Sequence, residues 1–356
     1  MPDTISPAPT DLPLIEGAQA WYGTEMAARD DWSFTLTAAD IAEIEAALDR
    51  VRTTDILAID RAAFPLPRLS ARLAEVGRDI LDGRGFFLLR GLPVERYSLA
   101  EAARIFWGIG AHWGEPVSQN GKGHVLGHVK DLGLDYADPL ARGYQTSARL
   151  PYHTDSSDLV GLLCLQTSKA GGLSSIVSTT TVYNEMVKRR PDLAAVLMQP
   201  LFRTRWGEVP EGRKPYYGTS PFNLTDGRLI CSYVRSATRK AQLMDVVPRL
   251  TPQQIEAMDL FDELANDPAL HLDMVLAPGD MQFVCNHSIA HSRTAYEDHP
   301  ALEKRRHLLR LWLACDDGPA LPADFTGEHQ GITAGGRPDG IKVPGVPLNA
   351  PLDASA

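Results

Sequence analysis

The chain has 356 residues and a formal net charge of −10, and 44% of its residues are hydrophobic. This composition is typical of a globular protein with a sizeable apolar core, and the acidic balance argues against general nucleic-acid binding. No apolar run reaches the length of a membrane span, and the N-terminus lacks the pattern of a signal peptide. The four cysteines are scattered and suit free thiols, so we expect a cytoplasmic protein. From the charge and the lack of an apolar span, we expect that it contacts neither a nucleic acid nor a membrane.

The first half of the chain is predicted to be mainly helical. Residues 1–25 are rich in Pro, Ala and Asp and predict an irregular arm, whereas 26–356 are expected to form a single domain. Apolar residues at helical spacing and N-terminal capping residues predict helices over 37–51, 67–81 and 98–107. Short apolar runs predict strands over 85–91 and 124–129.

Strands dominate the second half. Apolar runs bounded by turn residues predict strands over 158–165, 174–179, 281–285 and 306–314. Helices are expected over 183–189 and 251–265, and Asp226-Gly227 predicts a hairpin. Early helices and later strands favour an α+β, mainly β fold, with helices packed outside an antiparallel core. A double-sheet jelly roll is the architecture that we expect.

Two polar side chains in Pro151-Tyr-His153-Thr-Asp155 indicate a metal site. Side chains two apart on a strand point to the same face, so His153 and Asp155 would project together. An imidazole and a carboxylate are two thirds of the facial triad that holds non-haem Fe(II) and leaves open positions for other ligands. On its own, this triplet could equally be a surface hydrogen-bonded pair.

The missing histidine is sought in the segment 285–294, just after a predicted strand. Both His287 and His291 lie there, and either could close the triad. A single histidine in such a segment is more often part of the core than a metal ligand, so this segment alone decides nothing.

Two arginines on the last predicted strand give the second indication. Arg306 and Arg310 share one face of this otherwise apolar strand with Trp312. A buried guanidinium is costly unless it is paired, and arginine suits a carboxylate through two parallel hydrogen bonds. Ion pairs at the sheet edge would explain both residues. A carboxylate-binding pocket beside the metal would also explain them, and 2-oxoglutarate chemistry requires such a pocket.

Taken in order, these residues resemble the TauD/TfdA family of Fe(II)- and 2-oxoglutarate-dependent dioxygenases. The resemblance spans roughly residues 80–315 and is strong because five weak motifs occur in the family's order. The motifs are His153-Thr-Asp155, Gly171-Gly172-Leu173-Ser174, Pro278-Gly-Asp280, Asn286 with His291, and Arg306-His-Leu-Leu-Arg310.

The resemblance implies a double-stranded β-helix that uses Fe(II), 2-oxoglutarate and O2. His153, Asp155 and His291 would be the iron ligands, because His291 lies five residues after Asn286, as the distal histidine of the family does. Arg306 would bind the distal carboxylate of 2-oxoglutarate, and Ser174 would share it. The reaction would oxidise a substrate C–H bond, usually by hydroxylation, and release succinate and CO2. The presence of Asp155 favours hydroxylation, desaturation or cyclisation over halogenation.

The substrate is expected to be a small organic anion. The segment Glu115-Pro-Val-Ser118 lacks the His and Tyr that hold the sulfonate in taurine-oxidising members, so a taurine-like substrate is not expected. In the family, the second arginine lies toward the substrate, which makes Arg310 the predicted anchor. An ion pair with an internal acid is the alternative role. Further candidate contacts, for which ordinary packing is equally compatible, are Gln119, Asn120, Tyr152 and Trp312.

Two other classes of function remain open from the residues alone. A jelly-roll hydrolase or isomerase would use the His-Asp-His site but would not explain Arg306 with Ser174. A ligand-binding jelly roll with a vestigial site would not need all three ligands. Family members often form homo-oligomers, although the sequence fixes no number of subunits.

Overall fold

Two β-sheets form the frame of the molecule. The computed structural model describes residues 12–138, 140–322, 325 and 336–353. The larger sheet has the order β1-β2-β14-β6-β17-β3, and β4 also pairs with β17. Its strands are β1 (Ser33–Thr35), β2 (Phe86–Arg90), β3 (Glu115–Pro116), β4 (Leu126–Val129), β6 (Leu159–Gln166), β14 (Met281–Cys285) and β17 (His307–Ala314). The strand pairs of this sheet are antiparallel except for β1 with β2.

The smaller sheet is antiparallel and has the order β13-β8-β15-β5. Its strands are β5 (Leu150–His153), β8 (Ser174–Ser178), β13 (His271–Met274) and β15 (Ile289–Arg293). Three two-stranded ribbons complete the β structure among the described residues. They are β7 (Ala170–Gly171) with β16 (Tyr296–Glu297), β9 (Leu201–Thr204) with β10 (Tyr216–Thr219), and β11 (Phe222–Thr225) with β12 (Arg228–Cys231).

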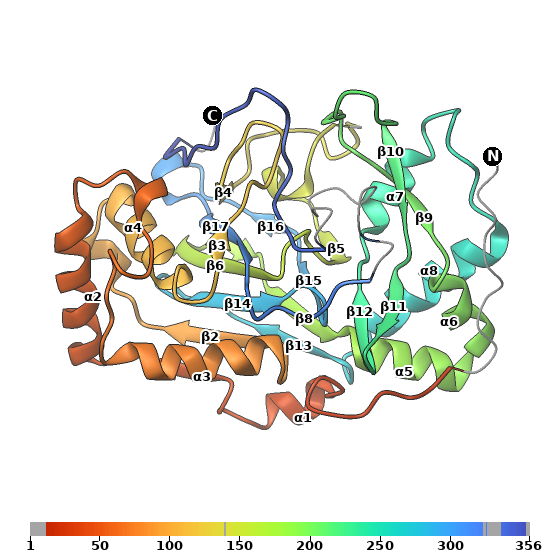
Figure 1. Ribbon diagram of the computed structural model, residues 1–356, viewed down its shortest axis with the longest axis horizontal. Helices are drawn as coiled ribbons and strands as arrows, with labels where there is room; N and C mark the ends of the chain where they lie inside the picture. Colours follow the sequence, from red (N-terminus) through yellow and green to blue (C-terminus); the bar gives the residue numbers. More distant parts are fainter. Residues whose placement is uncertain (1–11, 139, 323–324, 326–335, 354–356) are drawn as a thin grey trace.

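Helices cover the outer faces of the two sheets. Figure 1 shows α2, α3 and α4 at one end of the molecule and α5, α6 and α8 at the other, with the sheets between them. The helices are α1 (Gly23–Ala27), α2 (Ala38–Val51), α3 (Leu69–Leu81), α4 (Leu99–Gly110), α5 (Thr179–Arg189), α6 (Pro191–Leu197), α7 (Arg235–Ala241) and α8 (Pro252–Ala265). Among the described residues, no helix combines the length and apolar character needed to cross a bilayer.

Alternation along the strands divides the apolar core into layers. Leu309, Leu311 and Leu313 of β17 pack with α2, α3 and α4, whereas Trp312 faces the other way. Trp312 belongs to a cluster that joins strands of both sheets, including Ile176 of β8. The far face of the smaller sheet packs against α5, α6 and α8. The two sheets therefore face each other across a thin apolar layer, at one end of which the candidate site lies.

Most of the predicted elements are confirmed. The predicted strands over 158–165, 281–285 and 306–314 correspond to β6, β14 and β17, and the Asp226-Gly227 hairpin joins β11 to β12. Three predicted helices begin with complete capping boxes, in which the N-cap hydroxyl and the side chain three residues later satisfy each other's backbone N–H groups.

Two predictions are wrong in detail, and two of the short helices were missed. The helix expected from residue 183 begins at Thr179, because the Ser178 hydroxyl caps its N-terminus. The segment around His291 was expected just after a strand but is itself β15, an inner strand of the smaller sheet. Helices α6 and α7 were not predicted, since each has only seven residues and too few turns to show a helical period.

The N-terminal arm is packed rather than extended where the structure describes it. Residues 1–11 of the predicted arm lie outside the described residues. The Tyr183 hydroxyl donates to the carbonyl of Pro13, and the Asn184 amide exchanges two hydrogen bonds with the backbone of Ile15. Helix α1 begins at Gly23, inside the segment expected to be irregular. The division into an arm and one domain stays a prediction.

The Pro278-Gly279-Asp280 motif forms a turn that joins three strands of the larger sheet. The Gly279 N–H donates to the carbonyl of Cys164, and the Gly279 carbonyl accepts from the N–H of Leu92. The φ of Gly279 is +88°. The Asp280 carboxylate accepts from the Ala277 N–H at 3.0 Å and pairs with Arg90 at 2.8 Å. A Cβ at Gly279 would lie 1.9 Å from the Leu92 carbonyl oxygen, so only glycine fits there.

We expect Gly279→Ala to lower the free energy of unfolding by about 3 kcal/mol or more, because it adds a backbone clash to the cost of a positive φ. Gly227→Ala is the matched control: its φ is +76°, yet nothing lies within 4 Å of the added methyl. The control should lose about 1–2 kcal/mol. Urea denaturation of both variants measures the difference, and equal losses would contradict the close approach at Leu92.

Candidate metal centre

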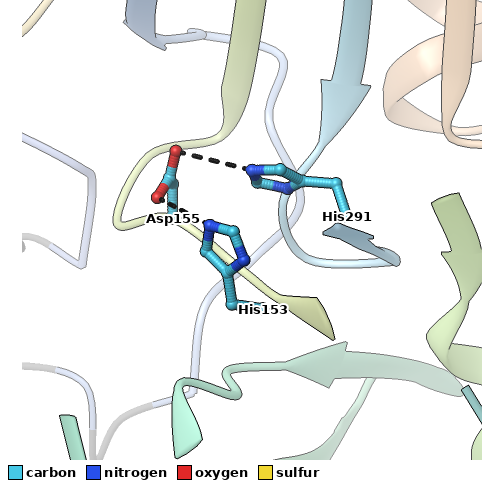
Figure 2. Close-up of side chains that lie close together, drawn as sticks. All are labelled: His153, Asp155 and His291. Atoms are coloured by element: carbon cyan, nitrogen blue, oxygen red, sulfur yellow. Dashed lines mark ion pairs between the residues drawn. The ribbon is translucent and has the colours of Figure 1, made fainter. Parts of the chain in front are cut away.

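The pairing of β15 with β5 brings the three predicted metal ligands together. His291 lies directly opposite His153 in the register of these strands, and their ring centroids are 4.3 Å apart. Asp155 lies two residues beyond the end of β5. Figure 2 shows its carboxylate turned back toward both imidazoles. One ligand atom from each residue can be chosen so that all three lie within 4.8 Å of one another.

Neighbouring side chains fix the orientation of Asp155. Its backbone N–H donates to the Asn286 side-chain oxygen at 3.0 Å, and its Oδ2 accepts from the Trp312 indole N–H at 2.9 Å. Arg310 Nη1 lies 3.6 Å from the same oxygen. Burial alone would raise the pKa of Asp155, but the positive charge of Arg310, the two histidines and the Trp312 hydrogen bond lower it below its ordinary value. The carboxylate is therefore ionised.

Both imidazoles are in a state that suits a metal ligand. His153 Nδ1 lies 2.8 Å from the carbonyl of Pro151, so Nδ1 carries a proton and Nε2 is the nitrogen that faces Asp155. Burial, with a contribution from His153, lowers the pKa of His291 to about 3 and keeps this ring neutral. His291 Nδ1 is buried without a hydrogen-bond partner in the described part of the chain. Two imidazoles and one carboxylate form the donor set that fits Fe(II).

His287 lies outside this group and has a different role. Its Nε2 is 2.8 Å from Oδ1 of Asp158, which is fully buried. The other oxygen of Asp158 accepts from the backbone N–H of Cys315 and from Arg337. The structure thus places His291 beside His153 and Asp155, and commits His287 to a network that holds the C-terminal segment.

A cavity joins the triad to the predicted 2-oxoglutarate residues. His153, Asp155, His291, Ser174 and Arg306 all line it. Arg306 is only 5% exposed, and its Nη1 is buried without a hydrogen-bond partner. Burial lowers the pKa of its guanidinium, and no carboxylate of the described residues forms an ion pair with it. Ser174 lies on β8, where its hydroxyl donates to Gln282 at 3.0 Å.

Comparison with known proteins agrees with this site. The model of the "Taurine catabolism dioxygenase TauD, TfdA family" matches residues 52–312. The chain is 31% identical over 329 residues to FR-33289 synthase of Streptomyces rubellomurinus, covering 91% of this chain and 97% of that protein. It is also 32% identical over 310 residues to the taurine hydroxylase-like protein SAT17 of Stachybotrys chartarum, covering 83% and 79%.

The chain belongs to the TauD/TfdA family. It is a non-haem iron dioxygenase that depends on 2-oxoglutarate, with Fe(II), 2-oxoglutarate and O2 as its cofactor and cosubstrates. The fold also resembles that of asparagine oxygenase in complex with Fe(II), 2S,3S-3-hydroxyasparagine and succinate. That similarity has a TM-score of 0.62 and 18% identity, and covers 87% of this chain and 99% of the other.

Within this TauD/TfdA site, two predicted substrate residues form hydrogen bonds on the metal side. Trp312 lines the cavity, but its indole N–H is committed to Asp155. Gln119 is 1% exposed and holds Arg310: its Oε1 accepts from Arg310 Nε at 2.7 Å, and its amide donates to the Arg310 carbonyl at 2.9 Å. Arg310 lines the cavity and pairs with Asp155, so the internal ion pair considered from the sequence is present.

Of the other two predicted contacts, Tyr152 lines the main cavity and Asn120 does not. The Tyr152 hydroxyl bonds to Ser175 at 2.6 Å, and its ring belongs to the core under α5, α6 and α8. Asn120 lines a neighbouring polar cavity that shares Arg142 and Tyr144 with the main one.

Arg293 and Tyr144 are among the cavity residues that sequence reasoning missed. Arg293 lies two residues after His291 on β15 and is only 4% exposed, so the alternation used for Arg306 and Arg310 would have found it once this segment was read as a strand. Tyr144 lies under the Arg310 guanidinium, 4.4 Å from ring centroid to Cζ. It comes from a short 3₁₀ helix, Gly143–Gln145, and no local pattern indicates its position.

We expect His291→Ala to weaken Fe(II) binding by more than about 100-fold, since even supporting residues of a metal site are worth up to that amount. His287→Ala should bind Fe(II) normally but lower the free energy of unfolding by about 1–3 kcal/mol, because Asp158 loses a buried partner. Anaerobic Fe(II) titration by calorimetry and urea denaturation measure the two effects. The reverse pattern would show that His287 is the ligand.

Proposed function

We propose that this dioxygenase hydroxylates a C–H bond of a small organic anion, with His153, Asp155 and His291 as the iron ligands. Arg306 and Ser174 hold the distal carboxylate of 2-oxoglutarate. The observation that carries this proposal is the buried Arg306 guanidinium, which lines the cavity of the triad with one nitrogen unpartnered. A buried positive charge without a bonded acid is costly, and a carboxylate ligand removes that cost.

The finer description of the fold is part of the same proposal. The two facing sheets, with strands distant in sequence paired side by side, are arranged as a double-stranded β-helix or jelly roll. In such a frame, His153 and His291 come from β5 and β15 of one sheet, and Asp155 follows β5. Arg310 comes from β17 of the other sheet, and Arg306 lies immediately before that strand. A cytoplasmic location and self-association stay predictions.

The chain's own residues prepare the site for the reaction. When bound, the iron with 2-oxoglutarate and O2 supplies the oxidising equivalents, as 2-oxoglutarate is converted to succinate and CO2. Asn286 and Trp312 hold Asp155 in place before any ligand arrives. Both sheets and the apolar layer between them exclude bulk water from one side of the cavity, which strengthens the electrostatic interactions inside it.

The charge of the cavity supports an anionic substrate. Asp155 is the one carboxylate among the described residues that line it, whereas five arginines do so: Arg142, Arg235, Arg293, Arg306 and Arg310. Arg142 pairs with Glu208, and Arg235 pairs with Asp259 and Asp262, so their charges are compensated. The excess positive charge therefore lies beside the metal ligands and favours anions.

Arg310 is the anchor that we propose for the substrate anion. Among the described residues, its one acidic partner is Asp155 at 3.6 Å, a contact longer than a hydrogen bond. A divalent cation would take up the negative charge of Asp155 and leave Arg310 undercompensated. Tyr144 and Trp312 flank its guanidinium and would form apolar walls for the rest of a small substrate.

The rival functions fit this site less well. A hydrolase or isomerase would use the triad but leaves Arg306 without a ligand, and membership of the TauD/TfdA family argues against it. A vestigial site would not need to keep Asp155 ionised, hydrogen-bonded to two supporting residues and close to Arg310.

We expect Arg306→Met to raise the KM for 2-oxoglutarate by about 10–100-fold, the loss typical of hydrogen bonds to a charged group. Arg305→Met is the matched control, since Arg305 is the adjacent arginine and donates to the carbonyl of His299. Succinate release at varied 2-oxoglutarate measures both. An unchanged KM in Arg306→Met would remove the main support for this placement of the cosubstrate.

A screen of small organic anions for stimulated succinate release identifies the substrate. We then expect Arg310→Leu to raise the KM for that substrate at least about tenfold, while substrate-independent decarboxylation of 2-oxoglutarate persists. Arg310→Lys, which keeps the charge, should lose less. Because Arg310 also contacts Asp155, Fe(II) binding is titrated in parallel. If substrate KM is unchanged, or if only Fe(II) binding fails, Arg310 supports the metal side alone.

A further inference from the structure

A second arginine lies beside the residues assigned to the distal carboxylate of 2-oxoglutarate. Arg293 is the last residue of β15 and faces Ser174 of β8 directly in the register of these strands. Directly opposed residues of an antiparallel pair project to the same face, here the face of His291. Arg293 lines the same cavity as Ser174 and Arg306.

Arg293 is buried with most of its hydrogen-bonding capacity unused. It is 4% exposed, and its Nε and Nη1 have no hydrogen-bond partner in the described part of the chain. Only Nη2 is engaged, by the carbonyls of Thr146 and Ala148. Among the described residues, no carboxylate forms an ion pair with it, although buried arginines are normally paired.

Arg293 and Arg306 crowd around one aromatic ring. Their Cζ atoms lie 4.6 and 5.2 Å from the centroid of Tyr296, whose π face compensates part of the charge. The guanidinium of arginine stays protonated in proteins, so both groups carry a positive charge. Two like charges in a buried cavity repel, and an anion placed between them relieves that repulsion.

We propose that Arg293 is a second cosubstrate-binding residue, which shares the distal carboxylate of 2-oxoglutarate with Arg306 and Ser174. This inference rests on the proposed placement of the cosubstrate at Arg306. The unpartnered nitrogens are the hydrogen-bond donors that this site requires. Arg306 offers Nη1, Arg293 offers Nε and Nη1, and the two oxygens of one carboxylate can accept from them.

A purely structural role for Arg293 makes a different prediction. Its Nη2 ties down the loop before β5, so truncation could disturb the whole cavity through this loop. A disturbed cavity weakens every ligand to a similar degree. Loss of a carboxylate contact weakens only ligands that carry the distal carboxylate, so the ratio of two affinities separates the roles.

The experiment measures anaerobic equilibrium binding of 2-oxoglutarate and of 2-oxopentanoate, which lacks the distal carboxylate, to the Fe(II)-loaded protein by calorimetry. We expect Arg293→Met to reduce the preference for 2-oxoglutarate at least about tenfold, as for loss of one charge-assisted contact. Arg293→Lys should retain part of the preference. Arg235→Met, an arginine of the same cavity that is paired with Asp259 and Asp262, should leave it unchanged.

Arg306→Met separates failure of this inference from failure of the proposed function. If Arg306→Met reduces the preference and Arg293→Met does not, the cosubstrate site stands and Arg293 only anchors the loop. If neither variant changes the preference, the distal carboxylate lies elsewhere and both assignments fail. If Arg293→Met does not fold, Arg293→Lys tests the proposal. An unchanged preference for 2-oxoglutarate in Arg293→Lys, together with a wild-type KM for 2-oxoglutarate, would also contradict it.

Discussion

The candidate site depends on the register of β15 between β8 and β5. In this register, His291 lies opposite His153 on one side and Ile176 on the other, while Arg293 lies opposite Ser174. A shift of one residue would turn every side chain of β15 to the opposite face and carry both groups away from the cavity. Ala290, which alternates with them and packs in the core under α5, α6 and α8, therefore helps to fix the orientation of these side chains.

Charge balance is the second constraint, and it connects the sheets. Asp155 belongs to the segment after β5, but Trp312 and Arg310 of the opposite sheet set its orientation and its ionisation. The Gln119 side chain in turn holds Arg310 by bonding to both the guanidinium and the backbone carbonyl of Arg310. The cavity thus gathers more positive than negative charge from the chain alone, which is a stable arrangement only if anionic ligands regularly occupy it.

Local patterns predicted most of the frame and about half of the site. The alternation along β17 correctly placed Arg310 and Trp312 on the face that lines the cavity, and Arg306, which lies just before β17, lines the same cavity. It could not show that Trp312 bonds to Asp155, since which partner a polar side chain finds depends on contacts between segments far apart in sequence. Arg293 was missed for a simpler reason: Ile289–Arg293 carries serine, histidine and arginine, and too few apolar residues to be recognised as a strand.

The motifs of the family differ in what they establish. Pro278-Gly279-Asp280 forms a turn that joins strands, and Gly172 leaves room for the Arg306 side chain, since a Cβ there would lie 3.1 Å from Arg306 Nε. Both would persist in a protein that had kept the fold and lost the reaction. The unpartnered nitrogen of buried Arg306 is different, because it lowers stability unless a ligand satisfies it. Unsatisfied buried charge of this kind, rather than the motif match, is the stronger physical argument that the site still binds its cosubstrate.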